Sequence, residues 1–317
     1  MNILVASNNL KTTGLGTFIY TQASELVSRG HNVDIVTLFN GKVGEMLSSH
    51  VIELDSVKKS YDLILTNQND ITSELIDRNV TGYVIFTVHG VAFDFNDCPS
   101  EDNLKYINKV VSLSPRIQQL LLGIEKSNYF DWDRKIESIV ISQPIDCERF
   151  SLQSPLRRTN PKVLSMVRGD NANNILRSAC EALDYEYIGW QKPVGYKFSE
   201  HDEDDIIFNV EDRINEADIV VGLGRIIYES LSCGRNAIVF DDREYQGNLG
   251  DGMVTPDNIK EYCFRFNCSG RSLCKTYDIS SMIQELKLYN PNNSEFFRNY
   301  ILKKFNVTDK VDEYLNL

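Results

Sequence analysis

The chain has 317 residues, 42% of them apolar and 25% charged, which is the composition of an ordinary globular protein with room for two domains. The formal net charge of −12 argues against a broad nucleic-acid-binding surface and against general adhesion to anionic lipid. No apolar run is long enough for a membrane span, no basic stretch precedes the first apolar run, and the seven cysteines are odd in number, so the sequence predicts a cytoplasmic protein with reduced thiols.

Strand and helix patterns alternate from the first residues. Residues 2–6 are a predicted strand, residues 14–29 a helix and residues 31–38 a second strand, which is how a Rossmann-like domain begins. Gly14 and Gly16 lie in the turn that opens the helix, where a ligand could approach the main chain. A tight turn without a ligand explains these two glycines equally well.

A dinucleotide cofactor is disfavoured at this turn. Ile19 stands where the dinucleotide fingerprint requires its third glycine, and no acidic residue ends the second strand. We therefore expect no NAD site.

The first half continues with predicted strands at residues 61–66, 83–88, 109–113 and 137–142. His89 directly follows the second of these strands. Polar residues just past the carboxyl ends of parallel strands line the binding crevice of an open α/β sheet, so His89 is a candidate site residue. A structural histidine is the alternative.

A linker separates the two halves. Residues 151–161 contain two prolines and two arginines and have no apolar periodicity. We therefore expect an N-terminal domain at residues 1–150 and a second domain at residues 151–306. The second domain begins with a strand at residues 162–167, whose end carries Arg168, and continues with a helix at 173–183 and a strand at 185–189.

The most informative stretch is residues 217–242. A buried strand at 218–222 breaks at the turn Gly222-Leu223-Gly224-Arg225, a helix follows to residue 233, and a further strand follows at 236–240. Glycines let a ligand approach the main chain, and the first N–H groups of the helix favour a phosphate. Glu229 lies one turn beyond Arg225 on the same face, where its carboxylate could accept hydrogen bonds from the vicinal hydroxyls of a ribose. The unit is therefore predicted to bind a nucleotide.

This stretch resembles a known family. Glu229 and the ten residues after it, Ser-Leu-Ser-Cys-Gly-Arg-Asn-Ala-Ile-Val, are similar to the donor-binding segment of GT-B glycosyltransferases, particularly the retaining family four. The resemblance implies two Rossmann-like domains facing across a cleft, with Glu229 at the ribose of a sugar nucleotide. Val221 stands where the family usually has another glutamate. The turn at Gly222 to Arg225 resembles that of a subset of related transferases.

The resemblance also assigns roles elsewhere. Residues 87–90 look like the family's Thr-x-His segment, which implies that His89 contacts the transferred sugar. Arg168 resembles the arginine that neutralises the donor diphosphate, and residues 14–16 resemble the glycine loop beside that diphosphate. The family's lysine about five residues after Arg168 is missing, so Arg225 or the helix N-terminus would supply its charge. The final helix, at residues 307–317, is expected to cross back to the first domain.

The sequence-based hypothesis is a metal-independent glycosyltransferase of glycan biosynthesis that retains the configuration of the sugar. Its donor is a nucleotide sugar, with a UDP-sugar as first choice, and no cofactor is expected. The acceptor is a glycan or a lipid-linked or protein-linked group; nucleic acid is not expected, and peripheral contact with a membrane is left open. A non-hydrolysing sugar-nucleotide epimerase is one alternative, although a lone His89 is a poor set of acid and base groups. A catalytically silent partner subunit is another, because of Val221 and the missing lysine.

The remaining segments carry weaker signals. Residues 246–252 form a predicted glycine-rich turn that could present N–H groups to a ligand. Predicted helices follow at 255–266, 279–289 and 295–305. Three cysteines, Cys263, Cys268 and Cys274, match no zinc spacing, and the acidic stretches at 94–97 and 201–205 are best explained as solvated loops. We expect no metal site.

Overall fold

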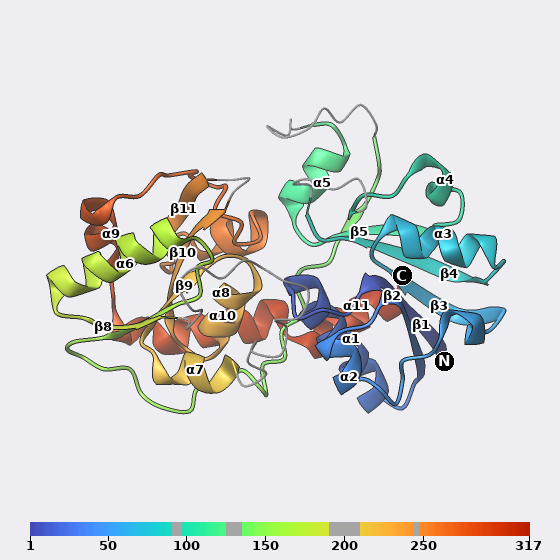
Figure 1. The fold of residues 1–317 in the computed structure, drawn as a ribbon, viewed down its shortest axis with the longest axis horizontal. Coiled ribbons are helices and arrows are strands. Elements are labelled where there is room, and N and C mark those ends of the chain that lie inside the picture. The colour runs from blue at the N-terminus through green and yellow to red at the C-terminus, as the bar shows by residue number, and fades with distance from the viewer. Residues whose placement is uncertain (91–96, 125–134, 190–209, 244–246) are drawn as a thin grey trace. The chain divides into compact units, whose positions relative to one another are not determined.

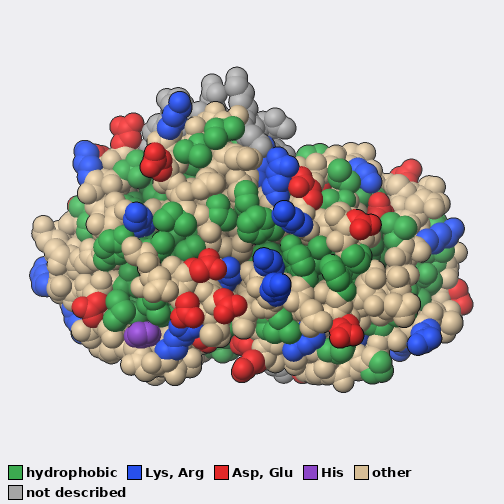
Figure 2. Space-filling model, turned by 180° about the vertical axis from the view of Figure 1, so that it is seen from behind, with side chains coloured by type: hydrophobic (Ala, Val, Ile, Leu, Met, Phe, Trp, Pro, Cys, Tyr) green, Lys and Arg blue, Asp and Glu red, His purple; other side chains and the backbone are tan. Residues whose placement is uncertain are grey.

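In a computed structural model, the chain is described apart from residues 91–96, 125–134, 190–209 and 244–246, and it forms two compact units (Figure 1). Unit 1 contains Met1–Pro144 and Val307–Leu317, and unit 2 contains the described residues from Ile145 to Asn306. Among the described residues, no helix combines the length and the apolar character that crossing a bilayer requires. On the face seen in Figure 2, acidic and basic side chains lie among one another.

Unit 1 is built on a parallel sheet of six strands in the order β2-β1-β3-β4-β5-β6. Its strands are β1 (Asn2–Asn9), β2 (Asn32–Phe39), β3 (Ser60–Thr66), β4 (Thr81–Val88), β5 (Lys109–Ser112) and β6 (Ile139–Val140). Its helices are α1 (Gly14–Ser28), α2 (Lys42–Met46), α3 (Asn69–Asp77), α4 (Glu101–Leu104), α5 (Pro115–Leu121) and α11 (Val307–Leu315). The strands are nearly continuous apolar runs, as expected of a parallel sheet that helices cover.

Helix α11 joins unit 1 although it comes last in the chain. It packs on α1, where the Arg29 guanidinium donates to the Thr308 carbonyl at 2.6 Å and forms an ion pair with Asp312. The buried Tyr314 hydroxyl lies 3.1 Å from the Thr87 hydroxyl of β4. These contacts tie the final helix to both a helix and a strand of the first unit.

Unit 2 has a five-stranded sheet in the order β11-β10-β9-β7-β8, parallel except for the edge strand β11, which is antiparallel to β10. Its strands are β7 (Lys162–Ser165), β8 (Glu186–Gly189), β9 (Ile219–Gly222), β10 (Asn236–Arg243) and β11 (Gly247–Met253). Its helices are α6 (Asp170–Leu183), α7 (Val210–Glu216), α8 (Arg225–Ser232), a π-helix (Lys260–Arg265), α9 (Ile279–Leu286) and α10 (Ser294–Phe305).

Each face of this sheet has its own core. One core joins alternate strand residues such as Val163 and Ile219 to α6 and α9. The other joins Leu164 and Val220 to α8 and α10. Neighbouring residues of a strand point to opposite faces of the sheet, so the same strands contribute side chains to both cores. Strand β9 is therefore packed on both faces, and α8 is packed against one of them.

The structure corrects two sequence predictions. Residues 247–253 form the edge strand β11, so the described part of the predicted glycine-rich turn is a strand paired with β10. Glycine is needed there for packing, because a Cβ at Gly250 would lie 2.3 Å from the Val239 carbonyl oxygen, beside an irregularity in the pairing with β10. The helix predicted at residues 255–266 is a π-helix at Lys260–Arg265, and the turn before it is closed by the Ile259 N–H, which donates to the Thr255 carbonyl at 3.0 Å.

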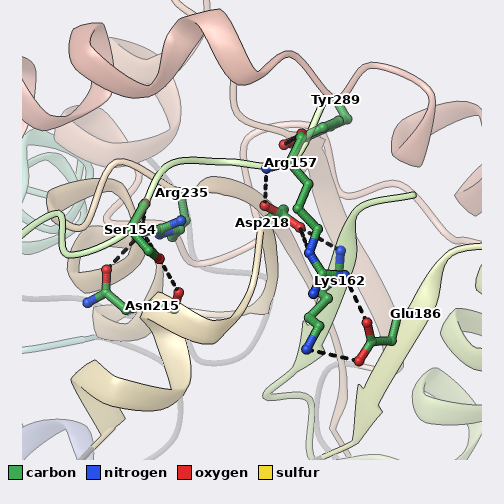
Figure 3. Close-up of polar contacts among 8 residues, drawn as sticks. All are labelled: Ser154, Arg157, Lys162, Glu186, Asn215, Asp218, Arg235 and Tyr289. Carbon is green, nitrogen blue, oxygen red and sulfur yellow. Dashed lines mark hydrogen bonds and ion pairs between the residues drawn. The ribbon is translucent and has the colours of Figure 1, made fainter. Parts of the chain in front are cut away.

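The segment between β6 and β7 is anchored to the amino ends of the strands of unit 2 (Figure 3). Both carboxylate oxygens of Asp218 accept main-chain N–H groups, from Arg157 and from Lys162, at 2.7 Å each. The buried Arg235 guanidinium donates to the Ser154 carbonyl at 2.6 Å and to the Asn215 side chain at 2.8 Å. These contacts lie at the opposite end of the sheet from the glycine turn, and they serve the fold.

Candidate functional site

Each sheet has one point where the strand order reverses. In unit 1 it lies between β1 and β3, and in unit 2 between β7 and β9. Ligands of open α/β sheets bind outside the carboxyl ends of the strands at this switch point. In unit 2 the segments there are the one leading to Arg168 and the turn Gly222-Leu223-Gly224. In unit 1 they are the segment before Gly14 and the one that begins at Asn67.

The glycine turn of unit 2 has a backbone that other residues would not adopt readily. Gly224 has φ +70° and ψ −131°, and a Cβ there would meet nothing within 4 Å. Gly222 packs closely, since a Cβ would lie 2.8 Å from the Ile226 side chain and 3.4 Å from Cβ of Met166. Gly224 is therefore required by conformation and borders open space, whereas Gly222 is required by packing against the segment that follows β7.

Arg225 and Glu229, at the start of α8, form a buried ion pair. The Arg225 Nε atom donates to Glu229 Oε1 at 2.8 Å, and the two residues are only 7% and 6% exposed. Helical spacing of four residues brings the two side chains together. The structure thus pairs two predicted site residues with each other. The Nε atom of Arg225 is bonded to the Glu229 carboxylate, although the sequence predicted that Arg225 binds phosphate.

Burial affects the titration of this pair. It raises the pKa of Glu229, and the adjacent Arg225 guanidinium opposes the rise. A guanidinium stays protonated in proteins, so the pair is an ion pair with a carboxylate. That carboxylate has about four lone-pair sites, of which Arg225 Nε uses one, so it retains capacity to accept hydroxyl groups.

Arg168 lies at the same edge of unit 2, immediately after β7. Its side chain is exposed, and its main-chain N–H donates to Asp241 Oδ1 at 2.7 Å. Asp241 is 1% exposed and also accepts from the Asp242 N–H at 2.9 Å. This buried carboxylate, which the sequence analysis did not single out, fixes the segment that carries Arg168.

A loop from unit 2 braces the glycine turn. The Gly224 N–H donates to the Cys268 carbonyl at 2.8 Å, and the buried Tyr228 hydroxyl of α8 donates to the Cys263 carbonyl at 2.6 Å. The Gly224 N–H is therefore occupied. In the first turn of α8 the Ile226 N–H has no acceptor within the helix, so it is the candidate donor to a phosphate.

Asp251, on β11, holds this loop in turn. Its Oδ1 atom accepts from the Leu273 N–H at 2.7 Å, while its buried Oδ2 atom has no partner among the described residues. Burial raises the pKa of Asp251, and the Leu273 N–H is the first group to oppose the rise. A carboxylate thus positions the chain that supports Gly224.

In unit 1 the two candidate glycines differ. Gly16 is buried in α1, and a Cβ there would lie 1.9 Å from the Lys11 carbonyl oxygen, so packing alone explains it. Gly14 is exposed at the first residue of α1, and a Cβ there would meet nothing within 4 Å. Thr13 caps the helix by accepting from the Gly16 N–H at 3.1 Å. Of this pair only Gly14 lacks a structural explanation and remains a candidate for contact with a ligand.

His89 follows β4 and is held on two sides. Its Nε2 atom lies 2.8 Å from Oδ1 of Asn67, which follows β3, and its ring packs edge-on against Phe18 of α1 with centroids 4.5 Å apart. Asn67 is 1% exposed. The contact with Phe18 places His89 beside the helix that Gly14 opens.

Sequence reasoning missed the carboxamides around this edge. The Asn8 N–H donates to Gln68 Oε1 at 3.0 Å, and Asn8 Nδ2 donates to Asp70 Oδ2 at 2.8 Å. The run Asn67-Gln68-Asn69, directly after the apolar residues of β3, was the available signal. This run of carboxamide residues indicates the position of the switch point, as the glycines of the neighbouring turn do.

The described residues contain no group of three or more His, Cys, Asp or Glu side chains suited to hold a metal ion. Cys263 and Cys268 are buried with their sulfur atoms 3.3 Å apart, and Cys274 is exposed. The acidic residues 94–96 and 201–205 considered in the sequence lie outside the described residues.

Solved structures with this fold cover the whole chain. Anabaena HepE, solved with UDP and glucose, has a TM-score of 0.60 at 13% identity and covers 100% of this chain and 98% of its own. An alpha-glucosyltransferase solved with UDP and mismatched DNA has a TM-score of 0.59 at 12% identity, and the match covers 100% of this chain and 99% of that one. A putative UDP-N-acetylglucosamine 2-epimerase from Listeria monocytogenes has a TM-score of 0.56 at 10% identity, and the match covers 99% of this chain and 95% of that one. No protein-family model and no curated protein matches the sequence.

These likenesses confirm the predicted fold class. The chain is an α/β protein of two Rossmann-like domains, and it matches structures of the GT-B architecture. At such low identity the likeness establishes the fold, and the activity has to be argued from the residues.

Proposed function

We propose that this protein transfers a sugar from a UDP-sugar to an acceptor hydroxyl, with retention of configuration and without a metal ion. In this proposal the nucleotide binds at the switch point of unit 2. The observation that carries the proposal is the turn at Gly224 followed, one helical turn on, by the buried carboxylate of Glu229.

The polar groups of unit 2 suit a nucleoside diphosphate. The Arg168 side chain and the Ile226 N–H would meet the phosphates, whose negative charge grows as the sugar leaves. Glu229, held by Arg225 at 2.8 Å, would accept the hydroxyls of the ribose. UDP is the nucleotide proposed because HepE and the alpha-glucosyltransferase were solved with it.

His89 in unit 1 would contact the transferred sugar. No side chain is assigned as a nucleophile, because the resemblance to retaining transferases implies reaction on one face of the sugar without one. The acceptor is proposed to be a hydroxyl of a glycan or of a lipid-linked or protein-linked glycoconjugate.

A panel of nucleotide sugars tests the proposal. UDP-sugars should raise the melting temperature more than GDP-, ADP- or CMP-sugars, because a ligand bound to the native state alone stabilises it. Slow release of UDP in the absence of an acceptor is expected from a transferase. A new UDP-sugar formed without release of UDP would instead identify an epimerase. One of the similar structures is a putative epimerase. Binding of UDP-sugars without turnover would identify a silent subunit.

Glu229→Gln tests the nucleotide site directly. The amide keeps an acceptor for Arg225 but loses the charge, so the Kd for UDP should rise roughly 10- to 150-fold if charged hydrogen bonds to the ribose are lost. Glu181→Gln is the matched control, since Glu181 is an exposed helical glutamate of the same unit. Equal UDP affinity in the two variants would reject the assignment of Glu229, whereas loss of UDP binding only in Glu229→Gln would support it.

A further inference from the structure

Asn173, near the start of α6, holds the main chain on both sides of Arg168. Its Nδ2 atom donates to the Val167 carbonyl at 3.3 Å and to the Gly169 carbonyl at 3.0 Å. Asn173 also stands five residues after Arg168, where the resembled family has its second cation, a lysine. A neutral amide bound to the segment after β7 therefore occupies the place of that lysine.

The amide of Asn173 is itself held by two hydroxyl groups. Its Oδ1 atom accepts from the Ser165 hydroxyl at 2.7 Å and from the Tyr187 hydroxyl at 2.9 Å. Reversing the amide would set its oxygen against two carbonyl oxygens, so its orientation is fixed. An amide has two N–H donors and two lone pairs, and these four contacts use all of them. Asn173 can therefore act on a ligand only through the segment that it holds.

The same segment is held from β10 as well. The Arg168 N–H donates to the buried Asp241 carboxylate at 2.7 Å. Gly169 packs closely on the next residue of β10, since a Cβ there would lie 2.3 Å from the Asp242 carbonyl oxygen. Residues 167–169 are thus fixed between α6 and β10, and the side chain of Asn173 supplies the contact on the α6 side.

We propose that Asn173 is a positioning residue that fixes residues 167–169 in the conformation that meets the diphosphate of the donor. The diphosphate rests on the proposed function, whereas the hold on the segment rests on the contacts of Asn173. Because these residues are ordered before the ligand arrives, binding does not have to order them, and its entropic cost is lower. This chain thus uses an ordered segment where the resembled family uses a second cation.

Hydrogen exchange of the ligand-free full chain tests the hold on the segment. In Asn173→Ala the amides of residues 167–169 should exchange roughly tenfold faster or more, because the two hydrogen bonds to the Val167 and Gly169 carbonyls are lost. Asn174→Ala is the matched control, since Asn174 is the next residue of α6 and is exposed. It should leave the exchange of this segment unchanged. Equal exchange in the two variants would overturn the proposal.

A comparison of two ligands tests whether the segment meets phosphate. In Asn173→Ala the Kd for UDP should rise roughly three- to thirtyfold, while the Kd for uridine, which has no phosphate, should change by less than about twofold. Equal losses for both ligands would show a general disturbance of unit 2 and would reject the role at the diphosphate. Tyr187→Phe removes one of the two hydroxyls that hold the amide, so it should give the same selective loss at a smaller size.

A lysine substitution separates order from charge. Asn173→Lys restores the family's cation but offers no acceptor to Ser165 and Tyr187, so the Kd for UDP should rise as it does in Asn173→Ala. Asn174→Lys adds the same charge one residue away and should not weaken UDP binding. Tighter binding of UDP by Asn173→Lys than by the unsubstituted protein would overturn the proposal, because the charge would then matter more than the order.

The two kinds of measurement keep this inference distinct from the proposed function. If the unsubstituted protein binds no UDP, the proposed function fails and the diphosphate is overturned as the ligand, while hydrogen exchange still decides whether Asn173 holds residues 167–169. If UDP binds and the exchange is the same in Asn173→Ala and Asn174→Ala, the proposed function stands and the inference fails.

Discussion

The carboxyl edges of the two sheets are built from different chemistry. In unit 1 the switch point is lined mainly by amides: Asn67 bonds to the His89 ring and to the Ala6 carbonyl, and Asn8 bonds to Gln68 and to the exposed carboxylate of Asp70. In unit 2 the corresponding edge has buried charges, with Arg225 and Glu229 paired and Asp241 holding main-chain N–H groups. Hydrogen-bonded amides fix the orientation of their neighbours, whereas buried charges also set up an electric field at the edge of the sheet.

The two units also contain glycines that are needed for different reasons. Gly224 has a backbone conformation that excludes most residues, and it is braced by the Cys268 carbonyl. Gly16 is needed because the Lys11 carbonyl leaves no room for a side chain. Gly224 is therefore a conformational requirement, whereas Gly16, like Gly222 of unit 2, is a packing requirement.

Removing one charge of unit 2 should give the largest effect. Glu229→Leu leaves the Arg225 guanidinium buried without its carboxylate, so the free energy of unfolding should fall by about 3–5 kcal/mol in urea denaturation. The double variant Glu229→Leu/Arg225→Met removes both charges and should recover most of that loss. If the single and double variants were equally unstable, the ion pair would not be the reason for the burial of these residues.

The three glycines should respond in different ways to alanine. Gly224→Ala should lower the free energy of unfolding by about 1–3 kcal/mol through backbone strain alone, since a Cβ there meets no atom within 4 Å. Gly16→Ala should be destabilising through a clash, by roughly 1–3 kcal/mol or more. Gly14→Ala should change stability by less than about 0.5 kcal/mol. A large loss in Gly14→Ala would show that the two units do not differ as described.

Replacing Asp251 by asparagine gives unit 2 the amide chemistry of unit 1 at one position, and the expected effect is the smallest. Burial raises the pKa of Asp251, so the stability it contributes is fully present below the ordinary aspartate pKa and is lost as the pH rises through the higher pKa of the folded protein. Asp251→Asn keeps an acceptor for the Leu273 N–H and carries no charge.

Urea denaturation of the unsubstituted protein and of Asp251→Asn should therefore be compared at pH 4 and pH 7. The variant should gain stability relative to the unsubstituted protein as the pH rises between these values. An opposite trend would mean that the N–H donors around Asp251 outweigh its burial.

The order of strands and helices could be predicted from the sequence because it depends on local patterns. The turn at Gly222 to Gly224, the helix after it and the shared face of Arg225 and Glu229 all follow from spacing within one short segment. The contact between those two side chains is a consequence of that spacing, although the sequence analysis assigned Arg225 to the phosphates.

Contacts between distant segments could not be predicted. Asp241 reaches the Arg168 N–H, Cys268 the Gly224 N–H, and Asn67 the His89 ring, and each depends on which strands become neighbours. Strand β11 was missed for a related reason, since its glycines read as a turn until the pairing with β10 is known. Local patterns therefore located the candidate residues and left their partners unknown.

The return of α11 to unit 1 has a consequence for biosynthesis. As a ribosome makes the chain, every residue of unit 2 emerges before Val307, so the second unit can be complete while Arg29 and Thr87 in the first still await Asp312 and Tyr314. The first unit to be made is the last to be finished, and a nascent chain stalled before residue 307 would expose the surface of α1 that α11 covers.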